Sequence, residues 1–210
     1  MENFQFVSEE EMYGFHYKEY FYDELLRPKQ KEITIVDCGA YHGDSLKRQL
    51  GILGERVKKA YAFEPDKENF SIMKKTLDGD ERIVFIEAGV SDEEKKYYFE
   101  QNEMSGHFSD DGNIEVDVKK IDDVVKEVKG TLCITMDVEG FEAAALRGAK
   151  NTILQYKPYI VACLYHKFRD IYEVPKIISE ICGDYKFYLR AGTHTESYAI
   201  PNNEYTRKEN

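Results

Sequence analysis

The feature that most constrains the fold is a repeated alternation of short apolar runs with amphipathic segments between residues 33 and 181. The apolar runs are rich in β-branched residues and have the length of buried strands, whereas the segments between them have helical spacing. Strands that alternate with helices need crossover connections, and these are right-handed in nearly every case. The pattern therefore predicts an α/β domain, with an open and mostly parallel sheet and helices on both faces.

The alternation can be assigned to particular segments. The expected strands are 33–36, 59–63, 82–86, 132–136 and 158–164. The expected helices are 44–53, 67–77, 121–128, 142–155 and 174–181. Segments 95–100 and 114–119 interrupt the alternation and predict an inserted β-hairpin with a polar loop at 101–113. Strands at 185–189 and 197–200 end the pattern, and we expect this close pair to be antiparallel.

The chain of 210 residues has the length of one domain with short flanking segments. Within residues 1–30, aromatic and apolar side chains at mixed helical spacing predict a small N-terminal helical cap. Residues 31–201 form the expected α/β domain, and residues 202–210 form a polar tail. The first residues are acidic and lack the basic and apolar regions of a signal peptide, so we expect a cytoplasmic protein.

Charge and composition exclude several classes of partner. The chain has 29 Lys and Arg against 40 Asp and Glu, a formal net charge of −11. This charge would repel the phosphate backbone of a nucleic acid and disfavours docking on anionic lipid. The longest apolar run, 159–165, is too short to span a membrane. Four cysteines without a C-x-x-C pair predict buried, reduced thiols rather than a zinc site.

Ligands of open α/β sheets bind outside the carboxyl ends of the strands, so the residues at those ends carry the functional signal. Asp37, Gly39 and Gly43 follow the first strand, where glycines allow a tight turn and a close ligand. The pattern is neither G-x-G-x-x-G nor a P-loop, and an acidic residue here suits a cationic or amino-bearing ligand. Glu64 ends the second strand, in the place of an acidic residue that binds a ribose hydroxyl pair.

Two further strand ends add to this pattern. Ala88 and Gly89, after the third strand, are small enough to leave room for a flat ring. Asp137, Glu139 and Glu142 follow the fourth strand within six residues. Three carboxylates this close need a cationic group beside them, and the candidates are a metal, a sulfonium or a protonated base. We interpret Glu142 as a favourable charge at a helix N-terminus.

Taken together, these segments resemble the FkbM family of S-adenosylmethionine-dependent methyltransferases over about residues 33–200. The matching segments are V-D-C-G-A-Y-H-G-D-S at 36–45, A-F-E-P-D at 62–66, I-T-M-D-V-E-G-F-E at 134–142, L-R-G-A at 146–149 and Y-H-K-F-R-D at 165–170. The resemblance implies a Rossmann-like class I methyltransferase fold, with a mostly parallel seven-stranded sheet and an antiparallel last strand. It also implies O-methylation of a small molecule such as a sugar, a glycan precursor or a secondary metabolite.

The resemblance further implies which residues bind S-adenosylmethionine. The residues expected around the methionine part of this cofactor are Asp37, Gly39, Ala40, Gly43 and Ser45. Glu64 would hold the ribose, Ala88 and Gly89 would border the adenine, and Asp137 would sit near the point of methyl transfer.

A hydroxyl acceptor must lose its proton as the new bond forms, and His166 or Asp137 can take it. We favour a metal-free site, because no third ligand is evident beside Asp137 and Glu139; a divalent ion held by these two residues is the alternative. Two other functions stay open. Thr135 and Ala191 depart from the lysine and histidine that the family often has, which permits a non-catalytic binding module. An NAD-dependent oxidoreductase is less favoured because G-x-G-x-x-G is missing.

Overall fold

The computed structural model describes residues 4–6, 27–102, 105–109, 114–191 and 195–202. Its main sheet has eight strands in the order β1-β11-β12-β10-β9-β2-β3-β4. These strands are β1 (Phe4–Phe6), β2 (Ile33–Cys38), β3 (Val57–Phe63), β4 (Ile83–Ile86), β9 (Thr131–Met136), β10 (Tyr159–Cys163), β11 (Tyr185–Ala191) and β12 (Thr195–Pro201). Among them, β12 alone runs antiparallel to its neighbours. The expected sheet with its antiparallel last strand is therefore confirmed, and β1 extends it beside β11.

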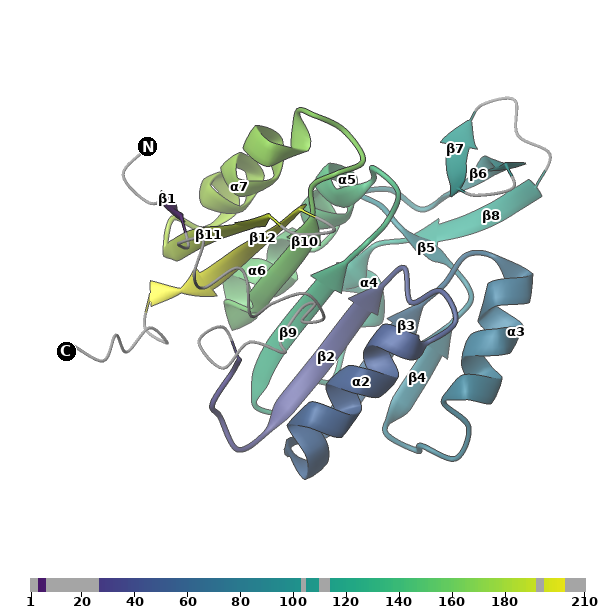
Figure 1. Ribbon diagram of the computed structural model, residues 1–210, viewed down its shortest axis with the longest axis horizontal. Helices are drawn as coiled ribbons and strands as arrows, with labels where there is room; N and C mark the ends of the chain where they lie inside the picture. The colour runs from purple at the N-terminus through teal and green to yellow at the C-terminus, as the bar shows by residue number, and fades with distance from the viewer. Residues whose placement is uncertain (1–3, 7–26, 103–104, 110–113, 192–194, 203–210) are drawn as a thin grey trace.

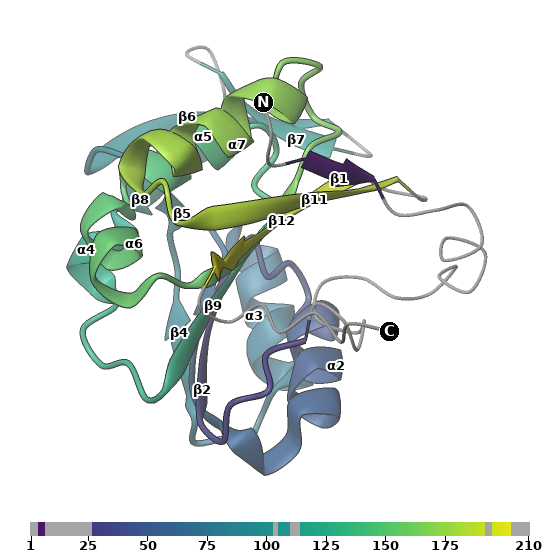
Figure 2. The ribbon, with the colours of Figure 1, turned by 90° about the vertical axis from the view of Figure 1, so that its left-hand side faces the viewer.

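The helices form two layers around this sheet. They are α2 (Asp44–Leu53), α3 (Lys67–Thr76), α4 (Ile121–Val124), α5 (Glu142–Arg147), α6 (Lys150–Tyr156) and α7 (Asp170–Ile181), with a short 3₁₀ turn at Gly54–Arg56. Figure 2 shows the sheet edge-on, with α2 and α3 on one face and α4 to α7 on the other. The prediction of helices on both faces is confirmed.

Alternating side chains of the strands supply a core to each layer. On β2, Val36 and Cys38 pack on the side of α5 to α7, whereas Ile33 and Ile35 pack on the side of α2 and α3. All four are completely buried. Since both faces of a central parallel strand are covered, apolar residues dominate β2, with Thr34 and Asp37 as its two polar residues, and this explains the apolar run in the sequence.

The expected hairpin is part of a larger unit. A second sheet has the order β5-β8-β6-β7, formed by β5 (Gly89–Val90), β6 (Lys95–Asn102), β7 (Ser105–Ser109) and β8 (Ile114–Lys119). β6 pairs antiparallel with β8, as expected, but also with β7. The interpretation of 101–113 as a simple loop was therefore wrong, because part of it pairs as a strand. Figure 1 shows β6, β7 and β8 extending away from the main sheet, with β5 nearest to it.

The expected single helix over 142–155 is instead two helices, α5 and α6, separated at Gly148 and Ala149. A Cβ on Gly148 would lie 2.0 Å from the carbonyl oxygen of Ser91, so this turn packs directly on the backbone after β5. The carboxylate of Asp122 then accepts hydrogen bonds from the backbone N–H groups of Asn151 and Thr152, at 2.9 and 2.8 Å. These contacts come from distant segments, so local spacing could not reveal the break.

The ends of the helices and of the chain also differ from expectation. α4 ends at Val124 rather than at residue 128, because the hydroxyl of Tyr61 bonds both the N–H and the carbonyl of Glu127, at 3.1 Å each. α7 begins at Asp170, four residues before the expected start. The helical cap expected within 1–30 falls on 9–26, outside the described residues, as does the polar tail beyond Asn202.

Among the helices that the structure describes, none has both the length and the apolar character needed to span a membrane.

Candidate active site

Asp37 lies one residue before the end of β2 and is 3% exposed. Its Oδ1 accepts a hydrogen bond of 2.6 Å from the hydroxyl of Thr135 on the neighbouring strand β9. Burial raises the pKa of Asp37 to about 6; the Thr135 hydrogen bond opposes this shift and the charge of Asp137 adds to it. The second oxygen, Oδ2, is buried and has no hydrogen-bond partner among the described residues. Asp37 is therefore an acidic group with one free acceptor at the carboxyl edge of the sheet.

The loop after β2 is held in a shape that requires glycine at two points. Gly39 has φ +80°, and a Cβ there would lie 2.0 Å from the carbonyl oxygen of Asp137. Gly43 has φ +83°, and a Cβ there would lie 2.9 Å from Cδ1 of Leu77. The N–H groups of Gly39 and Ala40 both donate to the carbonyl of Phe63 at the end of β3. The loop is thus fixed between the ends of β3 and β9.

Glu64 joins this loop to the segment after β3. It is 5% exposed, and its two oxygens accept hydrogen bonds from the backbone N–H groups of Tyr41, at 2.8 Å, and Asp66, at 2.9 Å. Burial raises the pKa of Glu64 to about 7, against the effect of these two hydrogen bonds. Each carboxylate oxygen has two lone pairs, so Glu64 can accept further hydrogen bonds from a ligand hydroxyl.

The remaining residues expected at the cofactor lie along the same edge. Ser45 is half-buried in the first turn of α2. Ala88 is buried, and Gly89 begins β5. The N–H of Glu64 donates to the carbonyl of Ile86, two residues before Ala88. Thus the predicted residues after β2, β3 and β4 occupy neighbouring strand ends.

A second group of polar side chains gathers after β9 and β10. Glu142 is completely buried, although it was expected to be only a charge at a helix start. Its Oε1 accepts from the backbone N–H groups of Val138 and Gly140, at 3.3 and 3.4 Å, and lies 2.9 Å from Nδ1 of His166. Sequence reasoning missed this role, although the spacing of the three carboxylates after the strand was the signal that pointed to it.

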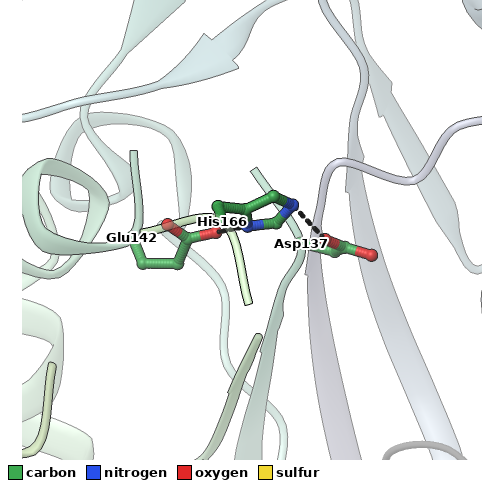
Figure 3. A group of neighbouring side chains, drawn as sticks. All are labelled: Asp137, Glu142 and His166. Carbon is green, nitrogen blue, oxygen red and sulfur yellow. Dashed lines mark hydrogen bonds and ion pairs between the residues drawn. The ribbon is translucent and has the colours of Figure 1, made fainter. Parts of the chain in front are cut away.

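His166 lies with its ring between two carboxylates (Figure 3). Nδ1 faces Glu142, whereas Nε2 lies 3.3 Å from Oδ1 of Asp137 and 3.3 Å from Oε2 of Glu139. Nε2 is buried and makes no hydrogen bond to the described residues. Burial acts to lower the pKa of His166, but the Glu142 hydrogen bond and the charges of the three carboxylates outweigh it and raise the pKa above 6.5.

Tyr165 is a further site residue that sequence reasoning did not assign. Its hydroxyl donates to both carboxylate oxygens of Asp137, at 2.8 and 3.0 Å, and its ring centroid lies 4.1 Å from that of His166. The side chain is 43% exposed, so it forms part of the rim of the site. The next residue in the chain after His166 is Lys167, whose ammonium group donates a hydrogen bond to the carbonyl of Gly140.

One atom each from Asp137, Glu142 and His166 lies within 4.8 Å of the others, close enough to consider a metal site. The sequence offered Asp137 and Glu139 as ligands of a metal ion, whereas the structure groups Asp137 with Glu142 and His166. However, the imidazole ring separates the two carboxylates, and each ring nitrogen faces a different one (Figure 3). Metal ligands converge on one point, whereas this arrangement suits a ring that receives a proton on one nitrogen while the other is held.

A family model described as the methyltransferase FkbM domain matches residues 37–189. The chain belongs to the FkbM methyltransferase family. The matched region contains every residue that was expected in the site. The FkbM methyltransferase of Methylobacillus flagellatus KT has a similar structure, with a TM-score of 0.71 and 28% sequence identity. The match covers 86% of this chain but 46% of that protein, so the FkbM-family chain described here spans less than half the length of that relative.

More distant structures share the fold of this FkbM-family chain. Fibrillarin of Aeropyrum pernix, solved with natively bound S-adenosyl-L-methionine, has a TM-score of 0.51 and 16% identity, over 82% of this chain and 68% of that one. A precorrin-6y C5,15-methyltransferase of Geobacter metallireducens GS-15 has a TM-score of 0.52 and 11% identity, over 81% of each chain. These likenesses confirm the expected class I methyltransferase fold. No curated protein matched the sequence.

Proposed function

We propose that this chain is an S-adenosylmethionine-dependent O-methyltransferase that acts on a hydroxyl of a sugar, a glycan precursor or a secondary metabolite. The observation that carries this proposal is the position of His166. Its Nε2 is buried, makes no hydrogen bond within the described residues, and lies beside Asp137. The backbone of Asp137 in turn touches Gly39 in the loop after β2. A base therefore stands next to the loop that we assign to the cofactor.

Two features of the described residues fit S-adenosylmethionine. Asp37 offers a buried acidic oxygen, Oδ2, without a hydrogen-bond partner, which suits the amino group of the methionine part. Gly39 and Gly43 have positive φ and pack against Asp137 and Leu77, so they fix the shape of the loop that would face the ligand. In this proposal Ala40 and Ser45 also border the methionine part, Glu64 accepts hydrogen bonds from the ribose, and Ala88 and Gly89 border the adenine.

Bound S-adenosylmethionine would supply a methyl group on a sulfonium for in-line displacement by the acceptor oxygen. The chain then has two tasks, to position the acceptor and to take its proton. His166 takes the hydroxyl proton at Nε2, and this transfer becomes favourable because the hydroxyl oxygen gains positive charge as it bonds the methyl group. Asp137 places negative charge near the sulfonium, and the Tyr165 hydroxyl holds its carboxylate in place. No step requires a metal ion.

Titration calorimetry with S-adenosylmethionine and with its demethylated product tests the cofactor assignment. Glu64→Ala should weaken binding by about 1–3 kcal/mol, because it removes charge-assisted hydrogen bonds to the ribose. Glu68→Ala is a matched control, since Glu68 is an exposed residue in the first turn of the neighbouring helix α3. Equal affinities of the wild type and Glu64→Ala would remove the ribose assignment.

A panel of neutral hydroxyl compounds, incubated with methyl-labelled S-adenosylmethionine, tests the reaction. Transfer of label to an oxygen of any compound supports the proposal. Tight cofactor binding without transfer to any compound would favour the non-catalytic binding module instead. Binding of NAD in place of S-adenosylmethionine would favour the oxidoreductase.

A further inference from the structure

We propose that Glu142 is the positioning residue of His166: its buried carboxylate holds Nδ1–H, so that Nε2 is the nitrogen that receives the acceptor proton. This inference rests on the proposed function, because it assigns a role within the same reaction. It concerns a residue whose sequence position suggested only a favourable charge at the start of α5.

The contacts of Glu142 are those of a fixed hydrogen-bond acceptor. The side chain is completely buried, and Oε1 lies 2.9 Å from Nδ1 of His166. The backbone N–H groups of Val138 and Gly140 donate to the same oxygen, at 3.3 and 3.4 Å. These two N–H groups belong to the turn between β9 and α5, so the carboxylate cannot swing away without losing both of these hydrogen bonds. Glu142 is therefore a rigid partner for the ring.

This contact decides which nitrogen of His166 can act as a base. An ionised carboxylate accepts hydrogen bonds but cannot donate them. A ring nitrogen that hydrogen-bonds such a carboxylate at 2.9 Å must carry a proton. Nε2 lies 3.3 Å from two carboxylates but makes no hydrogen bond to the described residues, so the lone pair of the neutral ring is left on Nε2. Without such a partner the proton can sit on either nitrogen, and part of the protein would present the wrong tautomer to the acceptor.

The opposite edge of the ring has the environment that proton transfer needs. Asp137 and Glu139, from the loop after β9, each place a carboxylate oxygen 3.3 Å from Nε2. Tyr165 donates to Asp137, and the Lys167 ammonium donates to the carbonyl of Gly140. The negative charges around Nε2 stabilise the imidazolium that forms once the hydroxyl proton arrives, as an acidic partner does for a catalytic histidine in general.

A further acidic residue, Asp170, lies close to His166 in the chain. Asp170, at the start of α7, is 2% exposed and accepts a hydrogen bond of 3.1 Å from the N–H of Lys167. It fixes the backbone next to His166, and among the described residues it makes no hydrogen bond or ion pair with the ring. A charge at the helix start would explain the presence of Glu142 but not its contact with His166, so the two roles can be separated by experiment.

The test uses Glu142→Gln, which removes the charge and replaces the carboxylate by an amide that can turn either its oxygen or its NH₂ group toward Nδ1. Glu142→Asp is the conservative variant, and Glu173→Gln is a matched control, since Glu173 in α7 forms a surface ion pair with Arg147 at the end of α5. Long-range ¹H–¹⁵N spectra, with the His166 signals assigned from a His166→Gln sample, report the tautomer and the titration of the ring directly. Circular dichroism checks that each variant is folded.

In the wild type and in Glu173→Gln, neutral His166 should carry its proton on Nδ1. In Glu142→Gln the tautomers should mix, and His166 should titrate at lower pH, because the strongest interaction that raises its pKa is removed. With an acceptor in hand, kcat should fall about 10²–10⁴-fold in Glu142→Gln with little change in the KM for S-adenosylmethionine, and Glu142→Asp should recover part of this loss.

An unchanged tautomer and titration of His166 in Glu142→Gln would overturn the inference. The spectra do not depend on turnover. If the wild type methylates nothing while the tautomer still depends on Glu142, the proposed function fails and the positioning contact stands. If methylation is found but Glu142→Gln retains the wild-type kcat and pH profile, the positioning role fails and the proposed function stands.

Discussion

The carbonyl oxygen of Asp137 lies 2.0 Å from the point that a Cβ on Gly39 would occupy. The N–H of Asp137 also donates to the carbonyl of Cys38, at 3.0 Å. The loops after β2 and β9 are thus in direct backbone contact. One of these loops carries the residues that we assign to the cofactor, and the other leads to the carboxylates around His166. A shift of either loop would therefore be transmitted to the other.

Gly39→Val should abolish binding of S-adenosylmethionine, because the added side chain overlaps the backbone of Asp137 and the residue must keep φ at +80°. The far-UV circular dichroism spectrum should stay near that of the wild type, since the displacement is confined to the loop. Gly51→Ala is the control: nothing lies within 4 Å of its Cβ position inside α2, so this variant should bind normally and gain about 0.5–1 kcal/mol of stability. Normal binding by Gly39→Val would mean that this is not the cofactor loop.

A comparison of His166→Ala with Asp137→Asn should show which residue is the base and which residue supplies negative charge near the cofactor. His166→Ala should lower turnover about 10²–10⁴-fold with little change in cofactor affinity. Asp137→Asn should weaken cofactor binding as well as turnover, because it removes negative charge beside the sulfonium. If His166→Ala retains near-full activity while Asp137→Asn is inactive, the base is Asp137.

The rate should also depend on pH in a defined direction. A base acts in its deprotonated form, so the wild-type rate should rise with pH through the raised pKa of His166, above 6.5. A pH–rate profile at saturating S-adenosylmethionine measures this. Loss of activity with a chelator, restored by magnesium or manganese, would contradict the metal-free site and indicate that the carboxylates hold an ion.

Asp37→Asn should make the protein more stable at pH 8 while it weakens cofactor binding. The buried carboxyl keeps its proton up to about pH 6, whereas an unfolded aspartic acid loses it near pH 3.8. Between these values the folded state binds more protons than the unfolded state, so the Asp37 contribution to stability falls as pH rises through this window. Asparagine avoids the cost of a buried charge, which is roughly 1–3 kcal/mol.

Thermal melts of wild type and Asp37→Asn at pH 4 and pH 8 measure this effect. The difference in Tm should be small at pH 4 and should favour the variant at pH 8. Asp44→Asn, at an exposed acid in the first turn of α2, should show no such gain. Melting curves of Asp37→Asn that follow the wild type at both pH values would show that the carboxyl of Asp37 does not retain its proton.

Asp122→Ala should lower the free energy of unfolding by about 1–2 kcal/mol, because the start of α6 loses its cap. The carboxylate accepts from the N–H of Asn151, and from both the N–H and the hydroxyl of Thr152, at 2.7–2.9 Å. The neighbouring Asp123 is exposed, and Asp123→Ala is the control in the same urea denaturation series. Equal midpoints for the two variants would contradict the capping role.

Local patterns predicted much of the fold because their causes are local. Asp66 accepts from the N–H groups of Glu68 and Asn69, and an acid directly before a helical segment is enough to indicate such a cap. The central strands were visible because both of their faces are buried. Segments whose structure depends on distant partners were not predicted: the break at Gly148 follows from contact with Ser91, and β7 follows from pairing with β6.

The order of residues is enough to say which chemical groups stand at the strand ends, because parallel strands bring their carboxyl ends to one edge of the sheet. How these groups are paired depends on the folded chain. Thr135 bonds Asp37 across 98 positions of the chain, and Glu142 reaches His166 across 24. Such pairs depend on strand register, side-chain rotamers and the exclusion of water, none of which appears in the spacing of residues. Burial is what converts Glu142 from a surface charge at a helix start into a fixed partner for an imidazole.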